Sequence, residues 1–157
     1  MSKNNVNYVA EGRNSVTPYL IVKNAAKAID YYKNVFGASE LMRMDGPDGK
    51  VGHAELRIGD SIIMLADENV AMGNRSAESI GASPVSLYVY LPDVDKTFEK
   101  ALAGGAKVLK PVEDQFYGDR SGFLRDPFGH LWGIATHKED VSAQEIEKRM
   151  KKLQQAA

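Results

Sequence analysis

Apolar positions in the first half of the chain follow two spacings, one typical of strands and one typical of a helix. Short apolar or alternating runs bounded by turn residues predict four strands: residues 17–22, 39–44, 51–58 and 61–67. Between the first two strands, apolar residues recur three and four positions apart and predict one helix face: Ala25, Ala28, Ile29, Tyr32 and Phe36. Asn24 suits the start of this helix, and Gly37 suits its end. Residues 15–67 are therefore predicted to form one β-α-β-β-β module.

The second half of the chain repeats this order of elements. Four further strands are predicted: residues 85–91, 107–112, 118–125 and 131–136. Asp93 suits the start of the intervening helix, and it follows Asn24 by 69 positions. A module of this size is too small to bury an adequate core alone. We therefore predict an α+β fold, in which two β-α-β-β-β modules, residues 15–67 and 84–137, form curved mixed sheets.

Three segments lie outside the two modules. Residues 1–14 are polar and are predicted to be a flexible arm, and residues 68–83 hold small and polar residues without a period and are predicted to be a linker. Ser142 and Glu145 fit a capping box, so residues 138–157 are predicted to contain a C-terminal helix. That helix is either a solvated surface helix packed by one apolar stripe or a contact with a partner.

The charge balance limits the classes of partner. The 157 residues include 20 Lys and Arg and 21 Asp and Glu, a net charge of −1, so no excess of positive charge attracts nucleic acid. No apolar run approaches the roughly 18–20 residues of a membrane helix, and the polar start lacks the apolar centre of a signal peptide. We therefore expect no nucleic-acid partner, no membrane partner and a cytoplasmic location. The absence of cysteine excludes a thiol nucleophile and a cysteine zinc site.

Two stretches resemble the vicinal oxygen chelate superfamily, which includes glyoxalase I, extradiol dioxygenases and bleomycin-resistance proteins. The first is residues 28–38 (AIDYYKNVFGA), and the second runs from 117–120 (YGDR) to 126–137 (DPFGHLWGIATH). The second stretch is similar to the PhnB-like branch, described as glyoxalase/bleomycin-resistance-like. The resemblance spans about residues 15–140. It implies the glyoxalase/bleomycin resistance fold, a small-molecule ligand and a homodimer.

The resemblance also implies four metal-ligand positions, two at the start of each module's first strand and two in each module's last strand. In this sequence they fall on four residues: Thr17, Ser86, Met64 and Gly133. Divalent metals in this fold take imidazole nitrogen or carboxylate oxygen, and none of the four residues supplies either. We therefore expect no bound divalent metal and no other cofactor. The same four residues are predicted to line a ligand cavity.

Polar residues in the strand 51–58 are candidates for chemistry. His53 and Glu55 are two positions apart and share one face of the sheet. His53 is the best available acid–base group on that face, because imidazole titrates near pH 6.5. The alternative is that His53 is a satisfied strand histidine. Glu55 either orients a ligand or belongs to a solvated sheet face.

A second group of candidates lies in the second module. Arg120 either clamps an anionic ligand with two hydrogen bonds or, with Asp119, fixes the entry of its strand by local pairing. Tyr117 and Trp132 belong to a set of aromatic residues that either fills the core or lines a cup in the curved sheet. A planar ligand stacked on Trp132 is predicted to fit that cup.

These observations favour a PhnB-like, glyoxalase/bleomycin-resistance-like protein that binds an apolar or aromatic small molecule without a metal. The alternative is a lyase or isomerase of the same superfamily, either metal-independent or metal-dependent, with His53 as base and Arg120 as anion clamp. True glyoxalase I activity is not expected, because it needs a metal to polarise the enediolate. A third hypothesis is a dimeric interaction module whose contact is the C-terminal helix.

Overall fold

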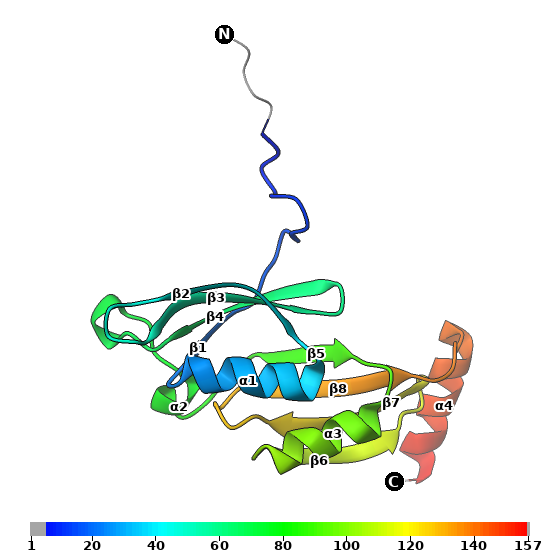
Figure 1. Ribbon diagram of the computed structural model, residues 1–157. Helices are drawn as coiled ribbons and strands as arrows, with labels where there is room; N and C mark the ends of the chain where they lie inside the picture. The colour runs from blue at the N-terminus through cyan, green and yellow to red at the C-terminus, as the bar shows by residue number, and fades with distance from the viewer. Residues whose placement is uncertain (1–5, 157) are drawn as a thin grey trace. The chain divides into compact units, whose positions relative to one another are not determined.

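The computed structural model describes residues 6–156, and the chain divides into two units at the boundary between Ser76 and Ala77 (Figure 1). The first unit contains one α-helix, four strands and a short 3-10 helix: β1 (Tyr19–Val22), α1 (Ala25–Phe36), β2 (Ser39–Asp45), β3 (Val51–Ile58), β4 (Ser61–Asp67) and η1 (Val70–Met72). The strands form one sheet in the order β1-β4-β3-β2, in which β1 is parallel to β4 and the other pairs are antiparallel.

The ends of α1 are set by the residues expected from the sequence. The Asn24 side chain accepts a hydrogen bond from the Lys27 amide at 3.1 Å, and Gly37 ends the helix in the left-handed region with φ 66°. Asp67 at the end of β4 accepts from the amides of Ala25 and Val51 at 2.9 and 2.7 Å. One carboxylate therefore ties the start of α1 and the start of β3 to the end of β4.

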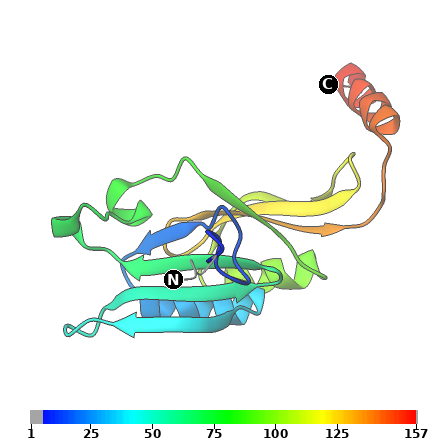
Figure 2. The same ribbon diagram turned by 90° about the horizontal axis from the view of Figure 1, so that it is seen from above.

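The second unit repeats the same order and adds a helix at each end. Its elements are α2 (Ala77–Ile80), β5 (Ser86–Tyr90), α3 (Val94–Ala103), β6 (Lys107–Asp114), β7 (Asp119–Arg125), β8 (Leu131–His137) and α4 (Ala143–Ala156). The sheet order is β5-β8-β7-β6, and β5 is parallel to β8. Asp93 caps α3 by accepting from the Lys96 amide at 3.0 Å, as predicted. Figure 2 shows α4 beyond the C-terminal end of β8.

The strand registers confirm the predicted repeat. Tyr19 lies opposite Met64 in the first sheet, and Tyr88 lies opposite Gly133 in the second. Each residue of the second pair follows its counterpart by 69 positions, from 19 to 88 and from 64 to 133. The predicted α+β fold of two β-α-β-β-β modules with mixed sheets is therefore confirmed.

The three segments outside the modules differ in part from expectation. The segment 68–83 contains η1 and α2, although a linker was predicted there. Ser142 accepts from the Glu145 amide at 3.2 Å at the start of α4, which agrees with the predicted cap. Residues 1–5 of the predicted arm, and Ala157, lie outside the described residues. None of the described helices is long and apolar enough to span a bilayer.

Each sheet has one face covered by its own helix, α1 in the first unit and α3 in the second (Figures 1 and 2). Residues opposite each other on neighbouring strands share a face. In the second unit, Gly122 in β7 faces Phe98 of α3, so its partner Ile134 in β8 lies on the covered face as well. Positions 133 and 137, Gly133 and His137, alternate with Ile134 along β8 and therefore belong to the other, open face. The open face of each sheet is therefore formed by every second residue of its strands.

Gly122→Ala tests the packing of α3 on β7. The added carbon would lie 2.9 Å from Cε2 of Phe98 and 3.1 Å from the backbone nitrogen of Val112, so we expect a loss of about 1–3 kcal/mol in the free energy of unfolding. Gly52→Ala in β3 is the matched control, because its added carbon would meet only the Met44 carbonyl oxygen, at an ordinary 3.5 Å. Its effect should stay within about 0.5 kcal/mol. Chemical denaturation measures both, and equal stability of the two variants would contradict the packing.

Candidate functional site

A row of side chains crosses the open face of the first sheet. The register places Tyr19 opposite Met64, Met64 opposite Glu55, and Glu55 opposite Met42. His53 precedes Glu55 by two positions on β3 and shares this face. The Tyr19 hydroxyl lies 2.8 Å from Nδ1 of His53, and Nε2 of His53 lies 3.3 Å from Oε1 of Glu55. We call these three hydrogen-bonded residues the Tyr19–His53–Glu55 series.

The series continues to the N-terminal arm. Nη2 of Arg13 lies 2.5 Å from Oε2 of Glu55. This hydrogen bond to Arg13 is the main cause that lowers the pKa of the Glu55 carboxyl, and burial opposes it. Glu55 is only 4% exposed, so it is a buried, paired carboxylate, not part of a solvated sheet face. Arg13, which lies in the arm predicted over residues 1–14, therefore contacts β3 through this carboxylate.

The open face of the second sheet carries aromatic rings in place of this polar series. Tyr88, Gly133 and Phe123 lie opposite one another on β5, β8 and β7, and we call them the aromatic row. The ring centroids of Tyr88 and Phe123 are 5.8 Å apart, and those of Tyr88 and Tyr90 are 5.3 Å apart. A Cβ at Gly133 would clash with both rings of the row. The missing side chain therefore lets the two rings close over the strand.

Burial and hydrogen bonding together raise the pKa of two tyrosines on this face. Burial is the main cause that raises the pKa of Tyr88 to about 12, and hydrogen bonding to Tyr117 adds to it while a bond to Ser121 opposes it. Tyr117 was predicted as a ligand residue, and the structure places its half-buried side chain next to Tyr88. The Tyr90 hydroxyl donates to Asp119 at 2.9 Å. This face therefore offers phenol groups at neutral pH.

Asp119 forms the polar end of the aromatic face, and sequence reasoning gave it only a structural role. It is buried and accepts from Tyr90 through one oxygen, while its other oxygen lies 2.7 Å from Nδ1 of His137. Nε2 of His137 lies 2.9 Å from Asp140. The hydrogen bond to Asp119 is the main cause that raises the pKa of His137, and the hydrogen bond to Asp140 adds to it. The alternation of Tyr88 and Tyr90 along β5 was the available signal for this face.

Trp132 lies on the face of the second sheet that α3 covers, opposite Leu124. It is 2% exposed, and its indole nitrogen donates to Asp126 at 2.9 Å. Asp126 also accepts from the amides of Phe128 and His130 at 2.9 Å each. The expectation that a planar ligand stacks on Trp132 in the cup is therefore corrected, because the ring belongs to the core.

Arg120 also points to the α3 face. Its guanidinium group bonds both carboxylate oxygens of Asp95 on α3 at 2.8 Å, and Asp114 on β6 at 3.1 Å. These bonds raise the pKa of Arg120, led by the bond to Asp95. The expectation that Arg120 clamps an anionic ligand is therefore corrected, because its guanidinium group is held by two carboxylates of the protein. Of the two alternatives, local pairing is the one observed, with Asp95 and Asp114 as partners.

The four metal-ligand positions implied by the resemblance do not fit a divalent cation. Thr17 precedes β1, Ser86 begins β5 and is exposed, and Met64 and Gly133 lie within β4 and β8. Two hydroxyls, a thioether and a residue without a side chain supply no imidazole or carboxylate ligand. Within residues 6–156, no group of three His, Cys, Asp or Glu side chains is arranged to hold a metal ion.

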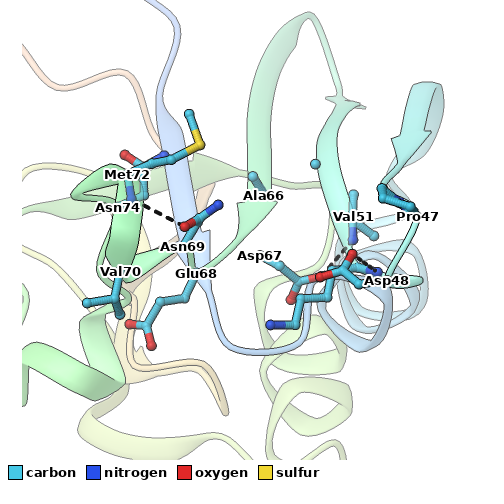
Figure 3. Close-up of a pocket in the computed structure, with 13 residues that line it drawn as sticks. Pro47, Asp48, Val51, Ala66, Asp67, Glu68, Asn69, Val70, Met72 and Asn74 are labelled. Atoms are coloured by element: carbon cyan, nitrogen blue, oxygen red, sulfur yellow. Dashed lines mark hydrogen bonds between the residues drawn. The ribbon is translucent and has the colours of Figure 1, made fainter.

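A groove of about 760 Å³ lies in the first unit, and sequence reasoning missed it (Figure 3). The turn between β2 and β3 supplies Asp48 and Lys50, and the segment around η1 supplies Asn69 and Met72. The two walls are separate in the sequence and meet because Asp67 at the end of β4 bonds the first residue of β3. The volume lies within the range of small-molecule sites.

Arg13→Gln tests the ion pair on the open face. The folded-state pKa of Glu55 lies below its ordinary value of 4.5, so the pair contributes stability above that pH and loses it as the pH falls through the folded-state pKa. We expect Arg13→Gln to lower the free energy of unfolding at neutral pH by about 1–3 kcal/mol, and this loss should shrink under acid conditions. Denaturant titrations at several pH values measure it.

The matched control for this test is Arg43→Gln. Arg43 bonds Asp45 at 2.7 Å on the surface of the same sheet, and exposed pairs of this kind contribute about 0–1 kcal/mol. A loss for Arg13→Gln that is no larger than the control, or that persists unchanged in acid, would contradict the stabilising pair.

The family model described as Glyoxalase/Bleomycin resistance protein/Dioxygenase superfamily matches residues 6–134. The chain is 43% identical over 139 residues to "Uncharacterized protein Mb0911c" of Mycobacterium bovis, which covers 87% of this chain and 91% of that protein.

Two solved structures are also similar. The crystal structure of TioX from Micromonospora sp. ML1 has a TM-score of 0.60 at 25% identity, covering 82% of this chain and 100% of that one. The PhnB protein from Bacillus cereus has a TM-score of 0.63 at 21% identity, covering 78% and 99%, which shows the fold alone. The extent of the family match, together with the paired β-α-β-β-β units, shows that the chain belongs to the Glyoxalase/Bleomycin resistance protein/Dioxygenase superfamily.

Proposed function

We propose that this chain binds an apolar or aromatic small molecule on the open face of its second sheet, without a divalent metal. The observation that carries the proposal is the aromatic row of Tyr88, Gly133 and Phe123. Tyr88 is 41% exposed and the neighbouring Tyr90 is 60% exposed. Exposed rings gathered on one sheet face are unusual unless something covers them, and a planar or apolar ligand would remove them from water.

The surroundings of the aromatic row supply the polar groups that small-molecule sites need. Such sites combine a mostly apolar lining with a few polar groups that orient the ligand. Here Asp119 and His137 lie at one end of the face, joined by a 2.7 Å contact. The ligand expected from this arrangement has a flat or apolar body and one hydrogen-bonding group at its edge.

The proposal that no metal takes part rests on the chemistry of the residues present. Met64 and Gly133 occupy the strand positions where the family implies carboxylates, and aromatic rings fill the space beside Gly133. A carboxylate restored at Gly133 would meet Tyr88 and Phe123 before it could reach an ion. Apolar packing in this place supports binding over chelation.

Assembly as a homodimer is part of the proposal, on the strength of the family resemblance. Native mass spectrometry of the purified protein reports subunit number, bound metal and any co-purified ligand together, and we expect a dimer without metal. Within its own unit, α4 is held by Arg149, which bonds Glu139 and the Phe116 carbonyl. Removal of residues 139–157 should therefore leave the protein dimeric, with a mass lower only by the two deleted segments. Loss of the dimer would favour α4 as the contact.

A second candidate function is that of a lyase or isomerase, and the Tyr19–His53–Glu55 series is the observation that favours it. Arg120 has no part in this candidate, because Asp95 and Asp114 hold it. An assay with methylglyoxal hemithioacetal, with and without Ni²⁺ or Zn²⁺, addresses glyoxalase I activity directly. We expect no turnover in either condition.

The binding proposal is tested with variants of the aromatic row. Calorimetric titration with a panel of aromatic metabolites and antibiotics is expected to give saturable binding for at least one member. Tyr88→Ala and Phe123→Ala should each weaken it about tenfold or more, because one ring contact contributes on the order of 1 kcal/mol beyond its buried area. Tyr8→Ala is the control, since Tyr8 is 95% exposed in the arm. Silence across the panel, or equal affinity in all variants, would contradict the proposal.

A further inference from the structure

A second cavity, of about 450 Å³, lies within the second unit, and its lining residues differ from those of the aromatic row. Three segments of the chain line it: residues between 77 and 82 around α2, residues 105 and 107 at the start of β6, and residues between 125 and 129 in the turn that follows β7. The volume lies within the range of small-molecule sites. The cavity is therefore large enough for a ligand of its own.

Close packing holds the three segments together. Gly129 has φ 88°, and an added Cβ there would lie 3.1 Å from Cβ of Ala77, so the turn lies directly against α2. An added Cβ at Gly105 would lie 3.5 Å from Cγ of Pro127, which places the start of β6 beside the same turn. The Asp126 carboxylate holds the turn itself by accepting from two amides and one indole nitrogen. The walls of the cavity are therefore fixed by contacts within the chain.

Two cations face each other in the lining of this cavity. Lys107 in β6 lies directly opposite Arg125 in β7. Cross-strand neighbours of this kind share one face of the sheet with their Cβ atoms about 4.5–5.5 Å apart, and like charges in this position destabilise the sheet. Neither side chain has an ion-pair or hydrogen-bond partner among residues 6–156. An anion bound between the two cations would therefore remove their repulsion.

The two carboxylates in the lining leave this positive charge in place. Asp126 is 4% exposed, and its oxygens accept the hydrogen bonds that hold the turn. Glu78 on α2 is exposed and forms no ion pair with Lys107 or Arg125. The charge of Glu78 opposes an anion in the cavity, which provides a test of opposite sign. The cation pair therefore remains available to a ligand.

We propose that this cavity binds a small molecule by its phosphate group, with Arg125 and Lys107 as the two cations that hold it. A guanidinium group binds two phosphate oxygens through parallel hydrogen bonds, whereas an ammonium group acts as a point charge. A phosphate monoester carries a charge of about −1.5 to −2 at pH 7, which matches two cations. The small side chains of Ala77 and Ala82 leave room for the rest of the molecule. This inference goes beyond the proposed binding at the aromatic row and is independent of it.

The first unit supplies a matched control. Arg57 lies opposite Ser39, the first residue of β2, just as Arg125 lies opposite Lys107, the first residue of β6. The corresponding pair of the first sheet therefore contains one cation and one hydroxyl. A single exposed cation of this kind is not expected to hold a phosphate group, because an isolated surface charge interacts weakly in water.

Calorimetric titration of the full chain at low ionic strength tests the site, with glycerol 3-phosphate as the probe and glycerol as its uncharged counterpart. We expect saturable binding of glycerol 3-phosphate and no binding of glycerol. Arg125→Gln and Lys107→Gln should each weaken binding about tenfold or more, because each removes a hydrogen bond between charged groups. Both residues are exposed, so neither change removes core packing. Arg57→Gln should keep the wild-type affinity. Absence of binding, or equal affinity in Arg125→Gln and Arg57→Gln, overturns the proposal.

Two further variants separate charge from geometry. Arg125→Lys keeps the charge and loses the parallel hydrogen bonds, so its affinity should fall between those of the wild type and Arg125→Gln. Glu78→Gln removes a negative charge from the lining and should strengthen binding about twofold, the size of an interaction between exposed charges. Weaker binding by Glu78→Gln would overturn the placement of the phosphate group in this cavity.

A titration with inorganic phosphate identifies the source of the bound group. Tighter binding of glycerol 3-phosphate supports an organic phosphate, whereas tighter binding of inorganic phosphate would overturn that part of the proposal and assign the site to the free ion. Amide shifts of the nitrogen-15-labelled protein should change most in residues 77–82, 105–107 and 125–129, and changes confined to Tyr88 and Phe123 would contradict the site. Failed binding across the aromatic panel beside measured phosphate binding would overturn only the proposal for the aromatic row.

Discussion

The register of one parallel strand pair in each unit decides which side chains this protein can use. β1 pairs with β4, and β5 pairs with β8, so that Tyr19 meets Met64 and Tyr88 meets Gly133. A slip by one residue would turn every open-face side chain toward a helix. The covered faces hold fully buried residues such as Leu65 and Ile134, and their burial holds the register in place. All candidate chemistry depends on this alternation.

The same backbone plan carries different chemistry in its two copies. The row across the first sheet is Tyr19, Met64 and Glu55, and the row across the second is Tyr88, Gly133 and Phe123. Replacement of a carboxylate by an aromatic ring in β7 converts a polar series into an apolar surface. A glycine in β8 then gives the rings room to approach the strand. Divergence of repeated units in this way lets one fold host unrelated reactions.

Several charged residues that attract notice in the sequence serve the fold. Arg120 joins β7 to α3 through Asp95, and Asp126 holds the turn before β8 through the indole nitrogen of Trp132. Arg13 joins the arm to β3 through Glu55. In each case a group of one element satisfies a polar group of another, because unpaired polar groups are costly inside a protein. Residue type alone did not separate these roles from ligand binding.

Local pattern was enough to determine the strands, the caps Asn24 and Asp93 and the repeat near 69 residues, since these features depend on neighbours in the chain. It also placed His53 and Glu55 on one face, because strand alternation has a period of two. Only the tertiary structure decided that Trp132 and Arg120 face α3, that Tyr19 reaches His53, and that Arg13 pairs with Glu55. These contacts join elements far apart in the chain, and which partner each side chain meets is set by sheet order and helix placement, which no short stretch of sequence encodes.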